Sequence, residues 1–373
     1  MATPCLSAIN LNNSLISDIE DGRLDDFTTI EAAFIISGTR NQVSLQQAID
    51  WHNSILQNIR DIHIVDVFEK EHSAEKVFQF LHGTWLKHYV KEATTLLDIK
   101  NKQEFNCVSA TILYNLTCDE LDLNTMAFET PTHVYTIFSD FGNDIMVENT
   151  TSLGFNIIKN LHNYSNYMEQ YYPENQIYKI GLHRLYAHEN SKGRRINNTE
   201  LLGLICYNQA YFAAEKSDFK EAYDYVLMAQ LFNQDSRSNV NFEINLYYRH
   251  GKRLHEMLDF HSAFQIFADA YYRYPFNSDF KINCINSYFR SLEIDWKNKD
   301  WNRVPLYTYD IADLEIIEDK HMAAIHRIFS DWVTYFVRTQ NKKDAIQALN
   351  LIKLFTKLSP DEIKLEQSLN SVD

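Results

Sequence analysis

The chain has 373 residues, of which 45% are hydrophobic and only 9 are Gly and 6 are Pro. Because Gly and Pro mark turns, so few of them exclude a turn-rich β-sandwich and a low-complexity chain, and they favour long helices. The 35 Lys and Arg residues against 50 Asp and Glu give a net charge of −15, which disfavours nucleic acid and anionic membranes as partners. The one compact basic cluster (Lys192, Arg194 and Arg195) is small and lies in a predicted loop.

No uncharged apolar run is long enough to span a membrane. Residues 1–10 lack the basic and apolar regions of a signal peptide, so either the protein is not exported or the chain begins after a removed signal. The cysteines are widely spaced without a CxxC pair, which predicts free thiols: Cys5, Cys107, Cys118, Cys206 and Cys284. The histidine spacings do not suit a metal site and no Gly-rich phosphate loop occurs, so neither a metal nor a cofactor is expected.

The N-terminal part is predicted to be helical. Thr28 with Glu31, and Ser44 with Gln47, each fit a capping box ahead of an apolar run. Ser73 is the predicted N-cap of a third helix. The apolar stripe of that helix is expected in the core, and it comprises Val77, Phe78, Leu81, Trp85 and Tyr89.

The pattern then changes to three short β-prone segments, 125–129, 132–138 and 144–151. Pro131 and a turn at 140–143 separate them. They predict a three-stranded meander that follows a helix over NCVSATILYNLTCDEL, which is an α+β arrangement. Residues 156–200 are expected to form a helical or irregular connector.

The C-terminal half repeats every 41 residues, and the repeat is anchored on Asp218, Asp259, Asp300 and Asn341. Small or apolar residues follow each anchor at intervals of four, eight and eleven, which places them on one helical face. The pattern resembles tetratricopeptide repeats, best in the second unit with its Ala263, Phe267 and Ala270. It predicts four stacked helix pairs from about residue 200 to 360, with an irregular helical bundle as the alternative.

Three residues of the predicted α+β part suit nucleophilic acyl chemistry. Asn106 is a predicted N-cap, which places Cys107 in a first helical turn where free amides favour a thiolate. His133 lies on the second predicted strand and Glu148 at the end of the third, so antiparallel pairing sets them side by side. A thiol, an imidazole and an orienting carboxylate make a cysteine nucleophile, whereas a small core cysteine and a structural histidine are the alternative.

The segments FNCVSATILYNLTCDELDL, THVYTIF and MVENTTSLGF resemble the transglutaminase-like superfamily of papain-type cysteine enzymes. The resemblance covers about residues 70–156 and is to bacterial members that carry tetratricopeptide repeats behind the core. It implies that Cys107 attacks an amide or ester carbonyl, that His133 carries the proton and that Glu148 orients the imidazole. The Cys107 N–H is the expected oxyanion donor, with Gln103 or Asn106 as candidates for the second by position.

These features together predict an α+β chain with three parts. A transglutaminase-like papain-type core is expected at 1–160, a connector at 161–199 and all-α tetratricopeptide-like repeats at 200–373. One predicted function is a cysteine hydrolase or acyltransferase that acts on a peptide or protein amide, with the repeats docking substrate or partner. The other is an inert core whose repeats serve as a scaffold for protein partners.

Overall fold

The structure, a computed structural model, describes residues 11–62, 66, 68–169, 179, 184, 191 and 193–371. The chain divides into two compact units, Met1–Glu243 and Ile244–Asp373, with the boundary inside helix α12 (Arg237–Glu256). The described residues are mostly helical, with small sheets in the first unit and a helical repeat region toward the C-terminus, so the α+β class is confirmed at this level. The predicted boundaries at residues 160 and 199 stay a prediction.

The N-terminal part is helical, and it comprises α1 (Leu11–Asp18), α2 (Thr29–Ile36), α3 (Gln42–Asp61), α4 (Lys70–Thr84), α5 (Leu96–Lys102) and α6 (Cys107–Asp119). A capping box begins α2, α3, α5 and α6. The capping box of Thr28 is present at α2. The predicted cap at Ser44 is wrong, because α3 begins one turn earlier, after Asn41. Ser73 does not cap α4 either; its hydroxyl lies inside the helix and bonds the backbone of Asp66.

A four-stranded antiparallel sheet lies in the first unit, with the strand order β5–β4–β3–β6. Its strands are β3 (Thr125–Glu129), β4 (Val134–Asp140), β5 (Asn143–Val147) and β6 (Arg194–Ile196). The first three are the predicted meander. The sequence does not predict β6, because three residues with two arginines carry no strand pattern, although Ile196 is fully buried opposite Ala127. A separate parallel pair joins β1 (His88–Tyr89) to β2 (Glu104–Phe105).

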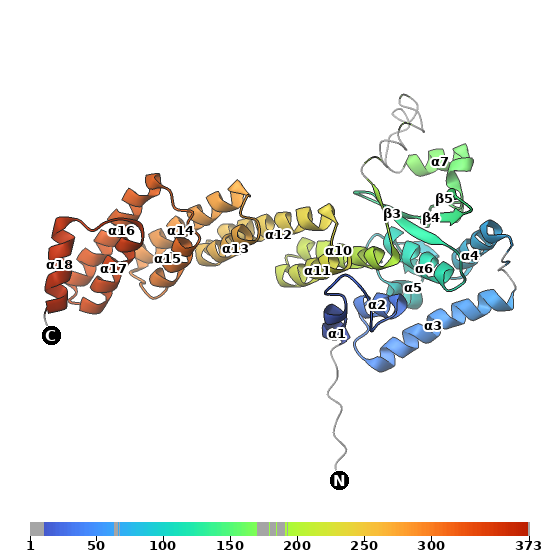
Figure 1. The fold of residues 1–373 in the computed structure, drawn as a ribbon, viewed down its shortest axis with the longest axis horizontal. Coiled ribbons are helices and arrows are strands. Elements are labelled where there is room, and N and C mark those ends of the chain that lie inside the picture. The colour runs from blue at the N-terminus through green and yellow to red at the C-terminus, as the bar shows by residue number, and fades with distance from the viewer. Residues whose placement is uncertain are drawn as a thin grey trace, which may run out of the picture. The chain divides into compact units, whose positions relative to one another are not determined.

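Helices cover both faces of the sheet (Figure 1). On one face, Val134 and Phe138 of β4 belong to the same buried core as Ile112 of α6. The other face lies under α7 (Leu161–Met168), which follows a short 3₁₀ turn η1 (Ile157–Lys159). There Tyr135 packs in a smaller cluster with Tyr164 and with other apolar side chains of β4, β5 and α7. Because successive side chains of a strand point to opposite faces of the sheet, β4 needs apolar residues on both of its sides to be covered on both faces.

Helices α10 (Asn198–Glu215) and α11 (Phe219–Phe232) also belong to the first unit, because residues of α10 such as Leu201 and Ile205 fill the core beside α6. Arg194 of β6 reinforces this attachment. Its guanidinium lies 3.3 Å from the carboxylate of Glu129 on β3 and 2.9 Å from that of Glu200 on α10, and it also bonds Asn233. The predicted basic cluster is therefore engaged in ion pairs at this position, and Lys192 lies outside the described residues.

The 41-residue helical repeat is confirmed. Its helix pairs are α10 with α11, α12 with α13 (Phe260–Arg273), α14 (Ser278–Asn298) with α15 (Val304–Asp313), and α16 (Asp319–Arg338) with α17 (Lys342–Phe355). The residue before each anchor has a left-handed backbone: Ser217, Leu258, Lys299 and Gln340, with φ of 62°, 60°, 54° and 58°. Three of the four anchors then cap the second helix of their pair, and Asp300 does not, since α15 begins after Arg303.

The repeated small and apolar positions form the inside of each pair. All of them are buried, namely Ala222, Val226, Ala229, Ala263, Phe267, Ala270, Val304, Thr308, Ile311, Ala345, Leu349 and Ile352. The close approach that small residues permit is clearest at Gly251 of α12. A Cβ at this position would lie 2.2 Å from the ring of Phe267, so only glycine fits.

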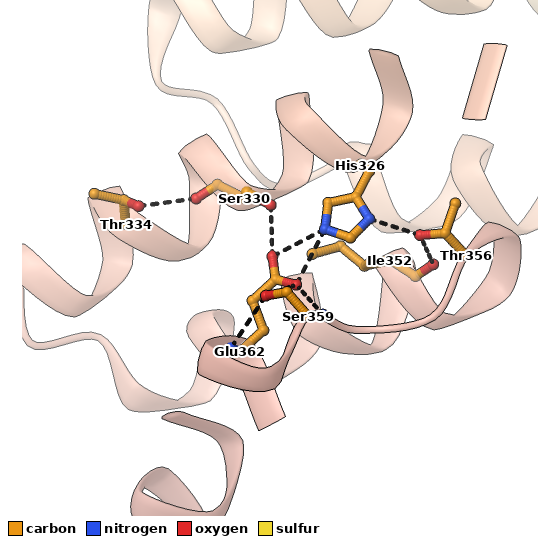
Figure 2. A network of polar contacts seen from close by, with 7 residues as sticks. All are labelled: His326, Ser330, Thr334, Ile352, Thr356, Ser359 and Glu362. Carbon is orange, nitrogen blue, oxygen red and sulfur yellow. Dashed lines mark hydrogen bonds and ion pairs between the residues drawn. The ribbon is translucent and has the colours of Figure 1, made fainter. Parts of the chain in front are cut away.

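The last helix, α18 (Pro360–Ser371), has no buried residue and is held by a polar network (Figure 2). The carboxylate of Glu362 lies 3.0 Å from Nε2 of His326 and accepts a 2.7 Å hydrogen bond from the hydroxyl of Ser330. On its other side, Nδ1 of His326 lies 2.8 Å from the hydroxyl of Thr356. The backbone N–H of Ser359 also donates to Glu362. These contacts attach α18 to α16 and to the end of α17.

Candidate functional site

Cys107 is the first residue of α6, as its predicted N-cap requires. The side-chain oxygen of Asn106 accepts from the N–H groups of Val108 at 2.9 Å and Ser109 at 3.1 Å. Because the first amides of a helix have no helical acceptor, the Cys107 N–H is left without one among the described residues. The Cys107 side chain is half-buried, whereas Cys118 in the same helix is fully buried and its thiol pKa is raised by that burial.

His133 and Glu148 are neighbours in the structure. His133 directly precedes β4 and Glu148 directly follows β5, so each lies inside its predicted strand but one residue outside the observed one, and the pairing of Thr136 with Val147 brings them together. Nε2 of His133 lies 2.7 Å from Oε2 of Glu148. The two side chains are only 7% and 0% exposed, so their interaction is not screened by water.

The charges at this pair stabilise each other. Burial alone would lower the pKa of His133, but the charge of Glu148 and hydrogen bonds with Cys107 and Glu148 outweigh it and raise the pKa to about 10. Burial would likewise raise the pKa of Glu148, yet the charge of His133 and the hydrogen bonds of Glu148 hold it below its usual value. The expected state near neutral pH is therefore an imidazolium paired with a carboxylate, next to a thiol within hydrogen-bonding reach.

The residues after Glu148 hold its carboxylate in place. The N–H of Thr150 donates to Oε1 of Glu148 at 2.9 Å, and the Thr150 hydroxyl donates to the same oxygen. The Glu148 N–H in turn donates to the carbonyl of Gly154 at 3.0 Å. A Cβ at Gly154 would lie 1.9 Å from the carbonyl oxygen of Glu148, so a glycine is required for this close approach.

A chain of hydrogen bonds between buried polar side chains links the segment that follows β5 to α6 and α10. Nδ2 of Asn149 donates to the hydroxyl of Thr136 at 2.8 Å, and that hydroxyl donates to Asn115 of α6 at 2.6 Å. Nδ2 of Asn115 then donates to Asn198 at the start of α10 at 3.0 Å. Because buried polar groups are costly to leave unpaired, this chain fixes the position of the segment after β5 relative to α6.

Cys107 and His133 line one cavity of about 110 Å³. Its other walls come from α6, from the loop between β3 and β4 with the strand residue on each side of it, from α10 and from the start of α12. They comprise Val108, Glu129, Thr130, Pro131, Thr132, Val134, Leu204, Tyr207, Asn208 and Ser238. The volume has room for a small chemical group beside the thiol. The mixture of apolar walls with a few polar groups is typical of a ligand site.

The two predicted oxyanion candidates lie close to Cys107 along the chain, but their side-chain amides are engaged. Nε2 of Gln103 donates to the carbonyl of Thr84 at 2.9 Å, and Nδ2 of Asn106 donates to that of Lys91 at 2.9 Å. Their role as donors stays a prediction. Sequence reasoning did not single out Gly154 for its contact with Glu148, because a lone glycine carries no signal of what its missing side chain would meet.

The described residues contain no group of three or more His, Cys, Asp or Glu side chains placed to hold a metal ion. His183, His188 and Cys5 lie outside the described part of the chain. None of the described helices is long and apolar enough to cross a membrane.

Comparison with known proteins corrects the predicted family. No family model and no curated protein matches the chain. A crystal structure of menin, which reveals the binding site for the Mixed Lineage Leukemia protein, matches with a TM-score of 0.34 and 12% identity over 96% of this chain and 88% of that chain. So low a TM-score carries no argument about function. The predicted membership of the transglutaminase-like superfamily is wrong, since no model of that family matches the chain, and no tetratricopeptide model matches it either.

Proposed function

We propose that Cys107 is a nucleophile directed at an acyl carbonyl, with His133 as the proton carrier and Glu148 as the group that orients it. The observation that supports this most is the 2.7 Å contact between buried His133 and Glu148, with Cys107 within hydrogen-bonding reach at the start of α6. A thiol at a helix N-terminus beside an imidazolium is the environment of a reactive cysteine. The proposal rests on this geometry and on no family relationship.

The reaction would proceed in two steps that balance. The Cys107 sulfur, once its proton has passed to solvent, forms a bond to the carbonyl carbon of an amide or ester, and the bond to the leaving amine or alcohol breaks while that group takes a proton from the His133 imidazolium. The resulting thioester is then attacked by water or by an amine, which gives up a proton to His133 as the C–S bond breaks. Water makes the protein a hydrolase and an amine makes it an acyltransferase.

Alkylation of the folded full-length chain with iodoacetamide tests the proposal. We expect mass spectrometry to show Cys107 modified ahead of Cys118, Cys206 and Cys284, because burial raises the pKa of those three thiols. His133→Ala should slow the modification at least about tenfold, since it removes the positive charge beside the reacting sulfur. His72→Ala, which changes an exposed histidine of α4, is the matched control. Modification of Cys107 that is no faster than that of the buried cysteines, or equally fast in both variants, would contradict the proposal.

Partner binding without chemistry is the second candidate. It is favoured by large apolar side chains that are exposed in the second unit: Met257, Leu258, Tyr272, Phe276, Ile282 and Leu306. Exposed apolar and aromatic groups are typical of sites that bind protein partners. In this second candidate function, the helical repeats bind the partner and the site around Cys107 has no catalytic activity.

Peptides selected from a random library on the intact chain provide the test of this candidate. Their affinity should fall at least about tenfold with Leu306→Ser, whereas Cys107→Ser should leave it unchanged. Affinities that depend on Cys107 and ignore Leu306 would favour the catalytic proposal instead.

A further inference from the structure

Three aromatic rings of the second unit form a corner around one lysine. Trp296 lies near the end of α14, and Trp332 and Tyr335 lie one turn apart on α16. Their ring centroids are between 4.9 and 6.3 Å apart, and each pair of rings meets at an angle between 79° and 85°. Trp332 is fully buried, whereas Trp296 and Tyr335 are half-buried. We call these three residues the aromatic corner.

A cation occupies the aromatic corner. Nζ of Lys299 lies 3.0 Å from the ring centroid of Trp296, 5.2 Å from that of Tyr335 and 5.7 Å from that of Trp332. Such positions are attractive, because the face of an aromatic ring carries negative partial charge. Within the described residues, no hydrogen bond or ion pair joins this ammonium to another side chain. The attraction of the three rings is therefore what holds it.

The aromatic corner suits the charge of Lys299 better than it suits its hydrogens. A lysine ammonium has three N–H donors, and the face of a ring offers them no lone pair. Each donor that enters the corner gives up a hydrogen bond to water, which offsets part of the attraction. A trimethylammonium group carries the same charge and has no donor to leave unsatisfied. Three rings without an acceptor therefore favour a methylated cation over an unmodified one.

The Lys299 side chain can leave the aromatic corner without loss of the turn that carries it. Lys299 precedes the repeat anchor Asp300, and its φ of 54° is close to those of Ser217, Leu258 and Gln340 at the equivalent positions. Because the same turn forms with serine, leucine or glutamine, it does not depend on a lysine side chain. Lys299 is exposed, so rotation of its flexible four-carbon stem is sufficient to open the corner.

We infer that the aromatic corner binds a methylated lysine side chain of a protein partner, and that Lys299 occupies the corner while the partner is absent. The stem of Lys299 already brings a cation to all three rings, which favours a lysine of the partner over a smaller quaternary ammonium compound. This site is independent of the chemistry proposed for Cys107. It gives the helical repeats a ligand of defined chemistry.

Titration calorimetry on the full-length chain tests the inference. The probes are an acetylated tripeptide of alanine, lysine and alanine, with its lysine either unmodified or trimethylated, and choline. We expect the trimethylated tripeptide to bind at least about tenfold more tightly than the unmodified one. Lys299→Ala removes the competing cation and should tighten this binding about three- to fivefold. Lys297→Ala is the matched control, because it removes the same charge from a side chain that pairs with Glu293 at 2.8 Å, and it should leave the affinity unchanged.

Variants of the nearest ring separate loss of the site from loss of the fold. Trp296→Leu should weaken the binding of the trimethylated tripeptide at least about tenfold, and Trp296→Phe, which keeps a smaller ring, should recover part of it. Equal affinities for the two tripeptides, or an equal gain in both lysine variants, would overturn the inference, since the methyl groups or the position of the charge would then not matter. A Lys299→Ala protein that does not bind the trimethylated tripeptide would overturn it as well. Choline that binds as tightly as this tripeptide would overturn the assignment to a lysine side chain.

Discussion

Gly154→Ala should disrupt the site from a residue that takes no part in its chemistry. The added Cβ would lie 1.9 Å from the carbonyl oxygen of Glu148 and 2.8 Å from its carbonyl carbon. Real Cβ atoms come no closer than 3.0 Å to such atoms, so the backbone has to move by about 1 Å. That movement stretches the 3.0 Å bond from the Glu148 N–H to Gly154 and carries the carboxylate away from His133.

The expected cost follows from these contacts. Overpacking of a well-packed region lowers the free energy of unfolding by about 1–3 kcal/mol, and the loss of a hydrogen bond lowers it by about a further 0.5–1.5 kcal/mol. We expect the free energy of unfolding of the first unit to fall by about 2–4 kcal/mol. Urea unfolding followed by circular dichroism measures this change. The rate at which iodoacetamide modifies Cys107 should fall with it, because a shift of this size takes the 2.7 Å contact between Glu148 and His133 beyond hydrogen-bonding distance.

Gly83→Ala is the matched control. A Cβ at Gly83 meets nothing within 4 Å, and the residue lies in α4, where alanine is favoured over glycine by about 0.5–1 kcal/mol. This variant should be as stable as the wild type or slightly more stable, with unchanged reactivity. A Gly154→Ala protein that matches the wild type in both stability and Cys107 reactivity would refute the reasoning, because it would mean that the close approach to Glu148 is not needed.

Three further predictions concern the charges and the repeats. The stability contributed by the charge of His133 is complete below its ordinary pKa of 6.5 and is lost as the pH rises toward about 10, whereas that from Glu148 is present above pH 4.5 and lost at lower pH. The difference in melting temperature between the wild type and the double variant His133→Gln/Glu148→Gln should therefore decline steadily from pH 6.5 to 10. A difference that stays constant over this range would contradict the raised pKa of His133. Leu258→Gly should raise the free energy of unfolding of the second unit by about 1 kcal/mol, because the left-handed backbone at this position strains a leucine. A urea midpoint below that of the wild type would contradict this, since it would mean that the exposed Leu258 side chain stabilises the unit by more than the strain costs. Glu362→Gln should speed hydrogen exchange in α18 but not in α16, because it weakens the contacts with His326 and Ser330. Unchanged protection of α18 would show that the packing of its partly buried Leu365 and Leu369 against the core is sufficient.

Local patterns in the sequence predict the local structure well. The 41-residue spacing of Asp218, Asp259 and Asn341 predicts helix starts because a side-chain cap acts within one turn. The same reasoning places Asn106 correctly ahead of α6. It fails at Ser44, since Asn41 offers a competing cap one turn earlier and tertiary packing decides between them.

Contacts between distant segments are harder to predict. His133 and Glu148 are found because they flank neighbouring strands of one meander, whose pairing follows from its short turn. Tyr89 is predicted on the helix that begins near Ser73, and this is wrong, because α4 ends at Thr84 and Tyr89 lies on a two-residue strand whose partner, Phe105, is set by the fold rather than by any local pattern. The family resemblance fails for a different reason, since short similar segments do not establish a shared ancestry.

The ion pairs of Arg194 have a consequence for how the chain can be cut. A fragment that ends before α10 would leave the carboxylate of Glu129 facing Arg194 without Glu200, and it would expose the core side of α6 where Leu201 and Ile205 now lie. Such a fragment would retain Cys107, yet it would be prone to aggregate through that exposed surface. A truncation meant to isolate the site should therefore keep α10 and α11 and end near Glu243, where the first compact unit ends.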